Sequence, residues 1–327
     1  MEDQVMRFIA DRARRAAQEA PPMRARPFDP PHKRDEDRQL IRQHSKTFSL
    51  AARWLPARSR AAVEALYAFC RTADDAADLP EAGSRRRLED YLAAIRGTSR
   101  SSDPVITRWL ALCDGMGMPR TWSAELVETL LTDFEMTQCE TLEELLAYSY
   151  GVASTVGLMT TFIVGFRPTS LAEDVFARAI ALGLAMQITN ILRDVAEDLA
   201  RGRVYLPLED MRRYGVTADD LSQKRLHPGW QRLCARYIQL ARDLYAFALP
   251  GIRQLTPAAR WPIALAAVWY RGILQDIERH RGDVFTRRAH VPLAEKVVIA
   301  LCQGVPAAMG WHRSPSAAPF AMVDRHD

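Results

Sequence analysis

The chain is dominated by apolar residues that recur with the period of an α-helix over nearly its whole length. Prolines and glycines stand near the ends of the periodic segments, and the alternation that is typical of a strand is scarce. The pattern predicts an all-α fold. The expected helical segments are residues 40–53, 59–79, 84–97, 103–116, 121–137, 142–166, 171–200, 229–248, 257–280 and 291–304.

The length of 327 residues would allow two domains, but no stretch inside the periodic region has the composition of a linker. We therefore expect one large domain over residues 39–304, preceded by an extension over residues 1–38 and followed by a tail over residues 305–327. A domain of this size buries about three quarters of the surface of the unfolded chain, so a deep central cavity is compatible with a stable core.

The first 38 residues mix arginine with aspartate and glutamate, which predicts neither a secretory signal nor a membrane-spanning helix. We expect a mobile tail there, with a short helix that touches a membrane surface as the alternative. No stretch reaches the roughly 18 apolar residues that a membrane helix needs. Five scattered cysteines without metal-ligand spacing indicate reduced thiols and a cytoplasmic location.

Two pairs of aspartates stand in alanine-rich, helix-forming sequence: Asp74 with Asp78, and Asp194 with Asp198. Residues four apart share one face of a helix, so each pair would present two carboxylates side by side. An isolated pair of this kind is usually part of a solvated surface. Here each pair follows an arginine and continues a polar stripe, which favours a functional site. The stripes comprise Tyr67, Arg71, Asp74 and Asp78 in one segment and Gln187, Asn190, Asp194 and Asp198 in the other.

Paired carboxylates without nearby histidine or cysteine suit Mg²⁺ or Mn²⁺ better than zinc. Magnesium commonly bridges one or two carboxylates to the phosphates of a substrate, so the implied substrate is a phosphate ester or a diphosphate. Arginines bind phosphate with a planar fork, and Arg71, Arg193 and Arg203 lie in or just after the two motifs. Each of these arginines has the alternative role of pairing with a nearby acid in its own helix.

Two other classes of protein are alternatives to an enzyme that binds a phosphate ester or a diphosphate. A helical nucleic-acid-binding protein is one hypothesis, because the chain contains 44 Lys and Arg residues. The 40 Asp and Glu residues are interspersed among them, so no purely basic stripe results and we expect no nucleic-acid partner. A structural helical scaffold is the other hypothesis, but a scaffold has no need of two inward-facing aspartate pairs.

Six short motifs, in matching order over residues 40 to 304, resemble those of the squalene/phytoene synthase family. An aspartate pair alone is shared with other prenyltransferases and with terpene cyclases, whereas the first motif together with the fourth is specific. The motifs are His44-Ser45-Lys46-Thr47-Phe48; Asp74 to Asp78 preceded by Cys70-Arg71; Tyr148 to Gly157; Gln187 to Asp198 followed by Gly202 to Pro207; Tyr270 to Leu274; and Asp283 to Arg288.

The resemblance implies the isoprenoid synthase fold, which is a helical bundle around a central cavity. It implies that Asn190 and the two aspartate pairs hold Mg²⁺ or Mn²⁺ ions, which bind two prenyl diphosphates. It also implies that Phe48 and Tyr148 line the reacting centre. The further substrate-binding residues that it implies are His44, Ser45, Arg71, Gln187, Arg193, Arg203, Tyr270 and Arg287.

The family joins two identical prenyl diphosphates head to head. One loses diphosphate, the double bond of the other captures its allylic cation, and a cyclopropylcarbinyl diphosphate forms, which ionises again and rearranges. We expect phytoene from two geranylgeranyl diphosphates, the first committed step of carotenoid biosynthesis, without NADPH. Relatives that convert farnesyl diphosphate to presqualene diphosphate, squalene or dehydrosqualene are the alternative, because sequence does not measure tunnel depth. A peripheral membrane contact for hydrocarbon release is also left open.

Overall fold

The computed structural model describes residues 2–21, 50–78, 83–135 and 138–309 of the chain. This part of the chain is built of helices, and its β-type pairing is limited to two isolated bridges. The all-α prediction is confirmed. The elements are α1 (Glu2–Glu19), α4 (Ala57–Asp78), α5 (Ser84–Ile95), α6 (Pro104–Met116), α7 (Thr121–Thr132), α8 (Leu142–Ser149), η1 (Tyr150–Ser154), α9 (Thr155–Val164), α10 (Ala172–Ala200), α11 (Leu208–Tyr214), α12 (Ala218–Ser222), α13 (Pro228–Ala248), η2 (Leu249–Gln254), α14 (Pro257–Arg279), α15 (Leu293–Ile299), η3 (Ala300–Gly304) and α16 (Val305–Met309).

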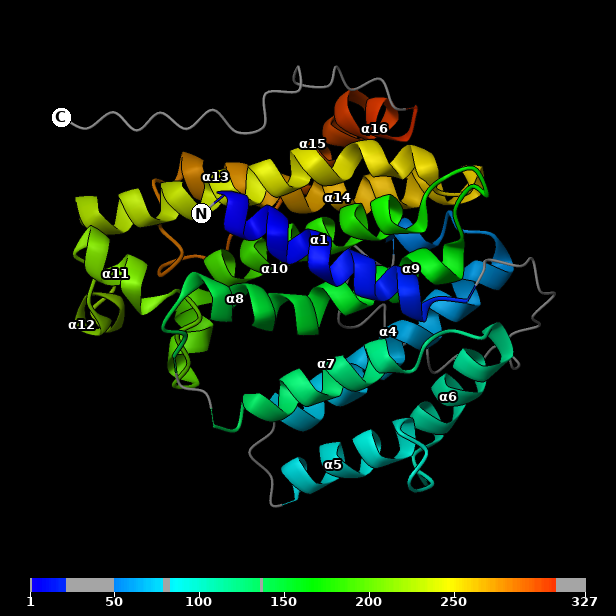
Figure 1. Ribbon diagram of the computed structural model, residues 1–327. Helices are drawn as coiled ribbons and strands as arrows, with labels where there is room; N and C mark the ends of the chain where they lie inside the picture. The colour runs from blue at the N-terminus through cyan, green and yellow to red at the C-terminus, as the bar shows by residue number, and fades with distance from the viewer. Residues whose placement is uncertain (1, 22–49, 79–82, 136–137, 310–327) are drawn as a thin grey trace.

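Helix α10 is the central element of the bundle and contacts α1, α9, α13, α14 and η1. Figure 1 shows α5, α6 and α7 below this centre, α13 to α16 above it, and α1 across the front. Leu184, Ile188, Ile191 and Val195 of α10 are buried, as the apolar stripe of this segment predicts. Packing of that stripe leaves the polar stripe of α10 facing a cavity.

Local sequence signals set several helix boundaries. At the start of α6, the side chain of Asp103 accepts a hydrogen bond of 2.8 Å from the backbone N–H of Val105, and Pro104 is the first helical residue. Helix α10 ends at Ala200, and Gly202 follows with a φ of 76°, a left-handed conformation that glycine adopts without steric cost. The predicted end of this helix near Arg201 is therefore confirmed.

Some boundaries differ from the expected segments. The segment 142–166 is divided by η1, a π-helical turn of a kind that often marks functional sites. The segment 121–137 ends as an α-helix at Thr132. Helices α11 and α12 were not predicted, because their seven and five residues are too few to display a helical period.

Part of each predicted terminal segment is helical. Residues 2–19, for which we expected a mobile tail, form helix α1, and its apolar residues Val5, Ile9 and Ala13 are buried. These residues are four apart and pack toward α10. Their burial therefore stabilises the helix, although charged residues surround them in the sequence. Helix α16 extends into the predicted C-terminal tail, whose remaining residues lie outside the described part of the chain.

Two helical stretches, Leu142–Val164 and Ala172–Ala200, are long and apolar enough to cross a membrane by length and composition. This finding corrects the expectation that no stretch has such a composition. The most apolar windows of the two stretches are 67% and 61% buried inside the protein. Packing within the bundle therefore accounts for their apolar character.

Candidate active site

A cavity of about 440 Å³ brings the two aspartate motifs together. Asp74 reaches it from α4, and Asp194 and Asp198 reach it from α10. The polar stripes of these helices therefore form two walls of one site. The other residues that line it are Tyr67, Cys70, Arg71, Leu126, Leu130, Asp133, Tyr148, Val152, Gln187, Asn190, Ile191, Arg193, Glu197, Arg201, Arg203, Tyr205, Tyr270 and Arg288.

Asp194 is held by two arginines. Arg193 donates two hydrogen bonds to its carboxylate, at 2.8 and 2.5 Å, and Arg288 donates a third at 3.0 Å. Burial works against the charge of Arg193, but the hydrogen bond and charge of Asp194 raise the pKa of this guanidinium. Tyr270 from α14 also hydrogen bonds to Arg193. One carboxylate and two permanent cations are thus fixed at the wall formed by α10.

Asp198 lies one helical turn beyond Asp194 in a different electrostatic setting. Burial and the charge of Asp194 raise the pKa of Asp198 to about 7, although Arg201 and Arg203 act in the opposite direction. Two carboxylates that share a buried wall repel each other. A cation placed between them would relieve this repulsion, which is the electrostatic property expected of a metal-binding pair.

The donor atoms beside these carboxylates fit a magnesium-type ion. The side-chain amide of Asn190 donates to Oε1 of Gln187 at 3.3 Å, and Oδ1 of Asn190 is buried with no hydrogen-bond partner. Within the described residues, no group of three Asp, Glu, His or Cys side chains is arranged to hold a metal by itself. Asp78 is the last residue of α4, and its side chain lies outside the part of the protein that the structure describes. The oxygen donors suit an ion whose coordination is completed by substrate phosphates and water.

The α4 wall carries Arg71, which pairs within its own helix. Its guanidinium lies 3.4 Å from Asp74 and also contacts Asp75. The intrahelical pairing that the sequence left as an alternative therefore occurs. Nε of Arg71 is nevertheless buried without a partner, so one donor of the fork remains for a ligand.

Tyr148 belongs to a buried network at the end of the cavity. Its hydroxyl, which has one proton to donate, lies 3.3 Å from the carboxylate of Asp133 and 3.1 Å from the hydroxyl of Tyr205, and the two rings stack with centroids 4.6 Å apart. Arg203 lies 3.5 Å from Asp133, whose side chain is only 3% exposed. Burial and the charge of Asp133 raise the pKa of Tyr148 well above its ordinary value. Tyr148 is therefore a neutral phenol that can donate a hydrogen bond.

Three residues of the site were not predicted from the sequence: Asp133, Tyr205 and Arg288. Tyr205 and Arg288 lie inside two of the motifs that resemble the family, so their side-chain types could have identified them as candidates. Asp133 stands directly after α7 in sequence that carries no motif. Its place in the site depends on its contacts with Tyr148 of α8 and with Arg203 and Tyr205 of the loop after α10, which no local pattern predicts.

Not every predicted site residue lines the cavity. Arg287 donates to Asp276 at 2.7 Å and lies 3.0 Å from Nδ1 of His280, and its neighbour Arg288 takes the place at the cavity wall. Three predicted residues lie outside the described part of the chain. They are His44, Ser45 and Phe48.

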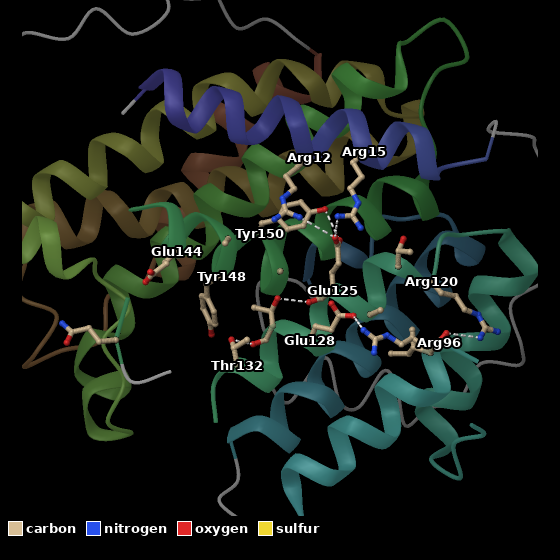
Figure 2. Close-up of a pocket in the computed structure, with 17 residues that line it drawn as sticks. Arg12, Arg15, Arg96, Arg120, Glu125, Glu128, Thr132, Glu144, Tyr148 and Tyr150 are labelled. Atoms are coloured by element: carbon tan, nitrogen blue, oxygen red, sulfur yellow. Dashed lines mark hydrogen bonds and ion pairs between the residues drawn. The ribbon is translucent and has the colours of Figure 1, made fainter. Parts of the chain in front are cut away.

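A larger hollow of about 850 Å³ lies beside the cavity and shares Tyr148 with it (Figure 2). Its charged residues are largely paired with one another: Arg96 with Glu128 at 2.6 Å, and both Arg12 and Arg15 of α1 with Glu125 at 3.7 Å. It contains neither aspartate motif. The chemistry therefore belongs to the smaller cavity.

Comparisons with known proteins identify the family of the chain. The family model for squalene/phytoene synthase matches residues 41–295. The phytoene synthase of Thermus thermophilus is 39% identical over 265 residues, covering 80% of this chain and 89% of that protein. The phytoene synthase of Arthrospira platensis is 36% identical over 278 residues, with the same two coverages.

Solved structures give the same result. A crystal structure of a dehydrosqualene synthase in complex with a ligand matches with a TM-score of 0.76 and 31% identity, over 85% of this chain and 96% of that chain. A squalene synthase from Alicyclobacillus acidocaldarius matches with a TM-score of 0.67 and 25% identity, over 76% of this chain and 93% of that chain. The fold is the isoprenoid synthase fold, and the chain belongs to the squalene/phytoene synthase family of prenyltransferases.

Proposed function

We propose that this chain condenses two geranylgeranyl diphosphates head to head to form phytoene. The observation that carries the proposal is the single cavity in which an aspartate-bearing face of α4 meets an aspartate-bearing face of α10. Two carboxylate walls suit two diphosphate groups. The phytoene synthases to which the chain is similar support the choice of product.

The residues that would hold Mg²⁺ are Asp74, Asp194, Asp198 and Asn190, together with Asp78 of the same motif. When bound, such ions stabilise the negative charge that develops on a leaving diphosphate. We also propose that the reaction requires Mg²⁺ and that it does not require NADPH.

The arginines of the site would bind and orient the diphosphates. Arg193 and Arg288 are already fixed by Asp194, so they keep their positions without a substrate. Arg71 offers its unpartnered Nε from the opposite wall. Guanidinium groups stay charged at all relevant pH values and bind phosphate oxygens in pairs, so they hold each diphosphate with its first carbon in a defined place.

The remaining lining residues exclude water and stabilise positive charge. In the proposed reaction, one substrate loses diphosphate, the double bond of the other attacks the allylic cation, and loss of a proton closes the cyclopropane ring. A second loss of diphosphate, rearrangement and proton loss give the hydrocarbon. Cations of this kind need dry walls and aromatic faces. The apolar residues in the cavity are Leu126, Leu130, Val152 and Ile191, and the aromatic ones are Tyr67, Tyr148, Tyr205 and Tyr270.

A second candidate is condensation of two farnesyl diphosphates. The solved dehydrosqualene synthase that this chain resembles favours it, because its identity of 31% is close to that of the phytoene synthases. The two candidates share every step at the diphosphate end and differ in the length of the prenyl chain.

Product analysis separates the two candidates. The purified protein would be incubated with geranylgeranyl or farnesyl diphosphate and Mg²⁺, with and without NADPH, and the hydrocarbon identified by mass. We expect phytoene from the geranylgeranyl substrate without NADPH. The Asp198→Asn variant, which removes one carboxylate and keeps the shape of the side chain, is the inactive control. Turnover of the farnesyl substrate alone would contradict the proposed product, and activity in a chelator would contradict the metal assignment.

A further inference from the structure

The connection between α14 and α15, residues 280–292, carries Arg288 to the wall of the active-site cavity. We call this connection the α14–α15 loop. Nε of Arg288 lies 3.0 Å from the carboxylate of Asp194 and 3.4 Å from that of Glu197, both on α10. The side chain of Arg288 is 57% exposed, so packing contributes little to its position. The place of this guanidinium therefore depends on the two carboxylates and on the backbone of the loop.

Asp276 fastens that backbone on both sides of Arg288. It lies near the end of α14, and the residue is only 7% exposed. Its Oδ2 accepts a hydrogen bond of 2.7 Å from the guanidinium of Arg287 and one of 3.0 Å from the backbone N–H of His290. The residue before Arg288 and the second residue after it are thus held by one oxygen atom.

The anchor at Asp276 is charged and partly shielded from water. Burial raises the pKa of a carboxyl group, but the hydrogen bonds from Arg287 and from His290 outweigh it and hold the pKa of Asp276 below its usual value. Asp276 is therefore ionised at neutral pH, and hydrogen bonds to a charged group are stronger than neutral ones. An exposed ion pair, Arg279 with Glu295 at 2.8 Å, also joins α14 to α15 and should contribute less.

The rest of the α14–α15 loop has a fixed course as well. The side chain of Asp283 accepts hydrogen bonds from the backbone N–H groups of Phe285, at 3.2 Å, and of Thr286, at 3.0 Å. Ala289 and Val291, on either side of His290, are buried. An exposed guanidinium at position 288 is therefore attached to a backbone that is bonded and packed on both sides.

We propose that Asp276 is a positioning residue, which holds Arg288 at the diphosphate site through its contacts with Arg287 and His290. The inference rests on the proposed function, in which Asp194 binds a metal ion. Such an ion would engage the carboxylate that now holds Arg288. Asp276 does not line the cavity, so its hydrogen bonds can persist when the site is filled and keep Arg288 in place.

A direct contact between Arg287 and the substrate, which the resemblance to the family implied, fits the structure less well. Arg287 would have to leave the ionised carboxylate of Asp276, and removal of the partner of a buried charge is costly. The anchor also explains why Arg288, and not Arg287, lines the cavity. The two neighbouring arginines then have separate roles, one in binding and one in positioning.

Binding of inorganic diphosphate with Mg²⁺ to the full chain, followed by calorimetry, tests the proposal. Arg288→Gln should weaken binding roughly 10- to 100-fold, the range for a lost hydrogen bond between charged groups. Asp276→Asn and Arg287→Gln should each weaken it roughly 3- to 10-fold, because Arg288 remains but is less well placed. In the Arg288→Gln background the same two changes should have almost no further effect, since they act through Arg288. The kcat/KM for geranylgeranyl diphosphate should follow the same pattern.

Arg279→Gln is the matched control, because it removes an exposed ion pair between the same two helices. It should bind diphosphate like the unaltered protein. Unchanged affinity in Arg287→Gln would overturn the proposal, also in the event that Asp276→Asn does not fold. Additive losses in Arg287→Gln/Arg288→Gln would overturn it too and would assign a direct contact to Arg287. If the protein binds diphosphate but forms no phytoene, the proposed reaction fails, whereas the comparison of affinities still decides the role of Asp276.

Discussion

Asp133 acts on the site through the groups that it holds. Its carboxylate accepts hydrogen bonds from the hydroxyls of Tyr148 and Tyr205 and lies beside Arg203. Two phenols and one guanidinium therefore share a single buried charge. Because each of these three side chains lines the cavity, the orientation of one wall of the site depends on this carboxylate.

Asp133→Asn should lower kcat by roughly 10- to 100-fold, because a lost hydrogen bond to a buried charge is equivalent to one to two powers of ten in rate. The amide keeps the shape of the side chain but removes the charge of Asp133 beside Arg203. KM should change less than kcat, since Arg71, Arg193 and Arg288 also bind the diphosphates in the proposed reaction. Steady-state kinetics with the proposed substrate measures both constants, and Tyr205→Phe, which keeps the carboxylate, should have the smaller effect. Equal kinetics in Asp133→Asn and the unaltered protein would rule out a positioning role.

Arg71 can donate from Nε to one diphosphate, because Nε remains unpartnered while the other two nitrogens contact Asp74 and Asp75. Arg71→Lys keeps the charge and loses the fork, so we expect it to weaken diphosphate binding less than Arg71→Ala does. Binding of inorganic diphosphate with Mg²⁺, followed by calorimetry, gives the two affinities. If both variants lose the same affinity, the charge at this position does not by itself contribute to diphosphate binding.

At the scale of elements, the π-helical turn η1 approaches α10 unusually closely. A Cβ atom placed on Gly183 of α10 would lie 2.5 Å from the backbone Cα of Ser154, and the hydroxyl of Ser154 donates to the carbonyl of Ile180 at 2.9 Å. This contact fixes the turn that follows Tyr148 and carries Val152 to the cavity. The shape of the site therefore depends on a residue that has no side chain.

Gly183→Ala should destabilise the protein by about 1 to 3 kcal/mol, because the clash involves backbone atoms that cannot rotate away. Gly272→Ala in α14 is the matched control. Its Cβ would meet only the methyl ends of Val291 and Ile299, at 2.9 and 3.0 Å, which can shift. Denaturant unfolding compares the two variants. Similar losses of stability in both would show that the backbone contact is not the cause.

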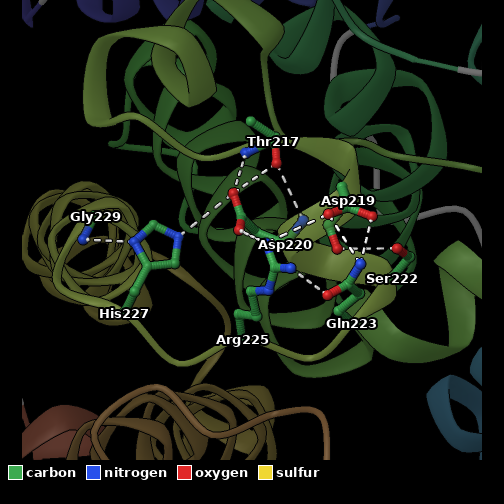
Figure 3. Close-up of polar contacts among 8 residues, drawn as sticks. All are labelled: Thr217, Asp219, Asp220, Ser222, Gln223, Arg225, His227 and Gly229. Atoms are coloured by element: carbon green, nitrogen blue, oxygen red, sulfur yellow. Dashed lines mark hydrogen bonds and ion pairs between the residues drawn. The ribbon is translucent and has the colours of Figure 1, made fainter.

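The short helix α12 is stabilised by a capping box (Figure 3). Hydrogen bonds from the hydroxyl and backbone N–H of Thr217 lower the pKa of Asp220 to about 2, with Arg225 and His227 nearby. The folded pKa lies below the unfolded value of about 4, so the stabilisation is present above that value and is lost as the pH falls toward 2.

The Asp220→Asn variant should accordingly be less stable than the unaltered protein near neutral pH, and the difference should shrink as the pH falls below about 4. Unfolding in denaturant at a series of pH values measures this difference. Asp219→Asn is the control, since Asp219 of the same helix lacks the capping bond. A difference that stays constant with pH would mean that the carboxylate charge does not stabilise the cap.

At the scale of the whole molecule, α1 lies outside the residues that the family model matches, yet it is part of the core. Ile9 is 1% exposed, and α1 contacts the central helix α10. Arg12 also lies over the ring of Tyr150, at 4.5 Å from its centroid, next to the turn that shapes the cavity. Helix α1 is thus joined to the bundle by apolar and charged contacts.

Ile9→Ala should lower the free energy of unfolding by about 2 to 5 kcal/mol, the usual range for truncation of a buried aliphatic residue. The unfolding transition should remain single, because α1 belongs to the same core as α10. Arg7→Ala, at an exposed position of the same helix, should leave stability nearly unchanged. An unaltered stability of Ile9→Ala would show that α1 unfolds independently of the bundle.

The sequence by itself determined the helices and the chemistry that they carry. The period of Leu184, Ile188 and Ile191 decides which face of α10 is buried, and spacing by four residues decides that Asp194 and Asp198 share the other face. Both properties are local, since they depend on residues within a few turns of each other. For the same reason the motifs were sufficient to predict the family and about half of the residues that line the cavity.

Only the tertiary structure decided which residues meet across the fold. Asp133 joins Tyr148 and Tyr205, Arg288 rather than Arg287 reaches the cavity, and the N-terminal segment forms a packed helix instead of a tail. Each outcome depends on contacts between segments that are distant in the chain. Such contacts are selected by packing of the whole core, and no local pattern encodes them.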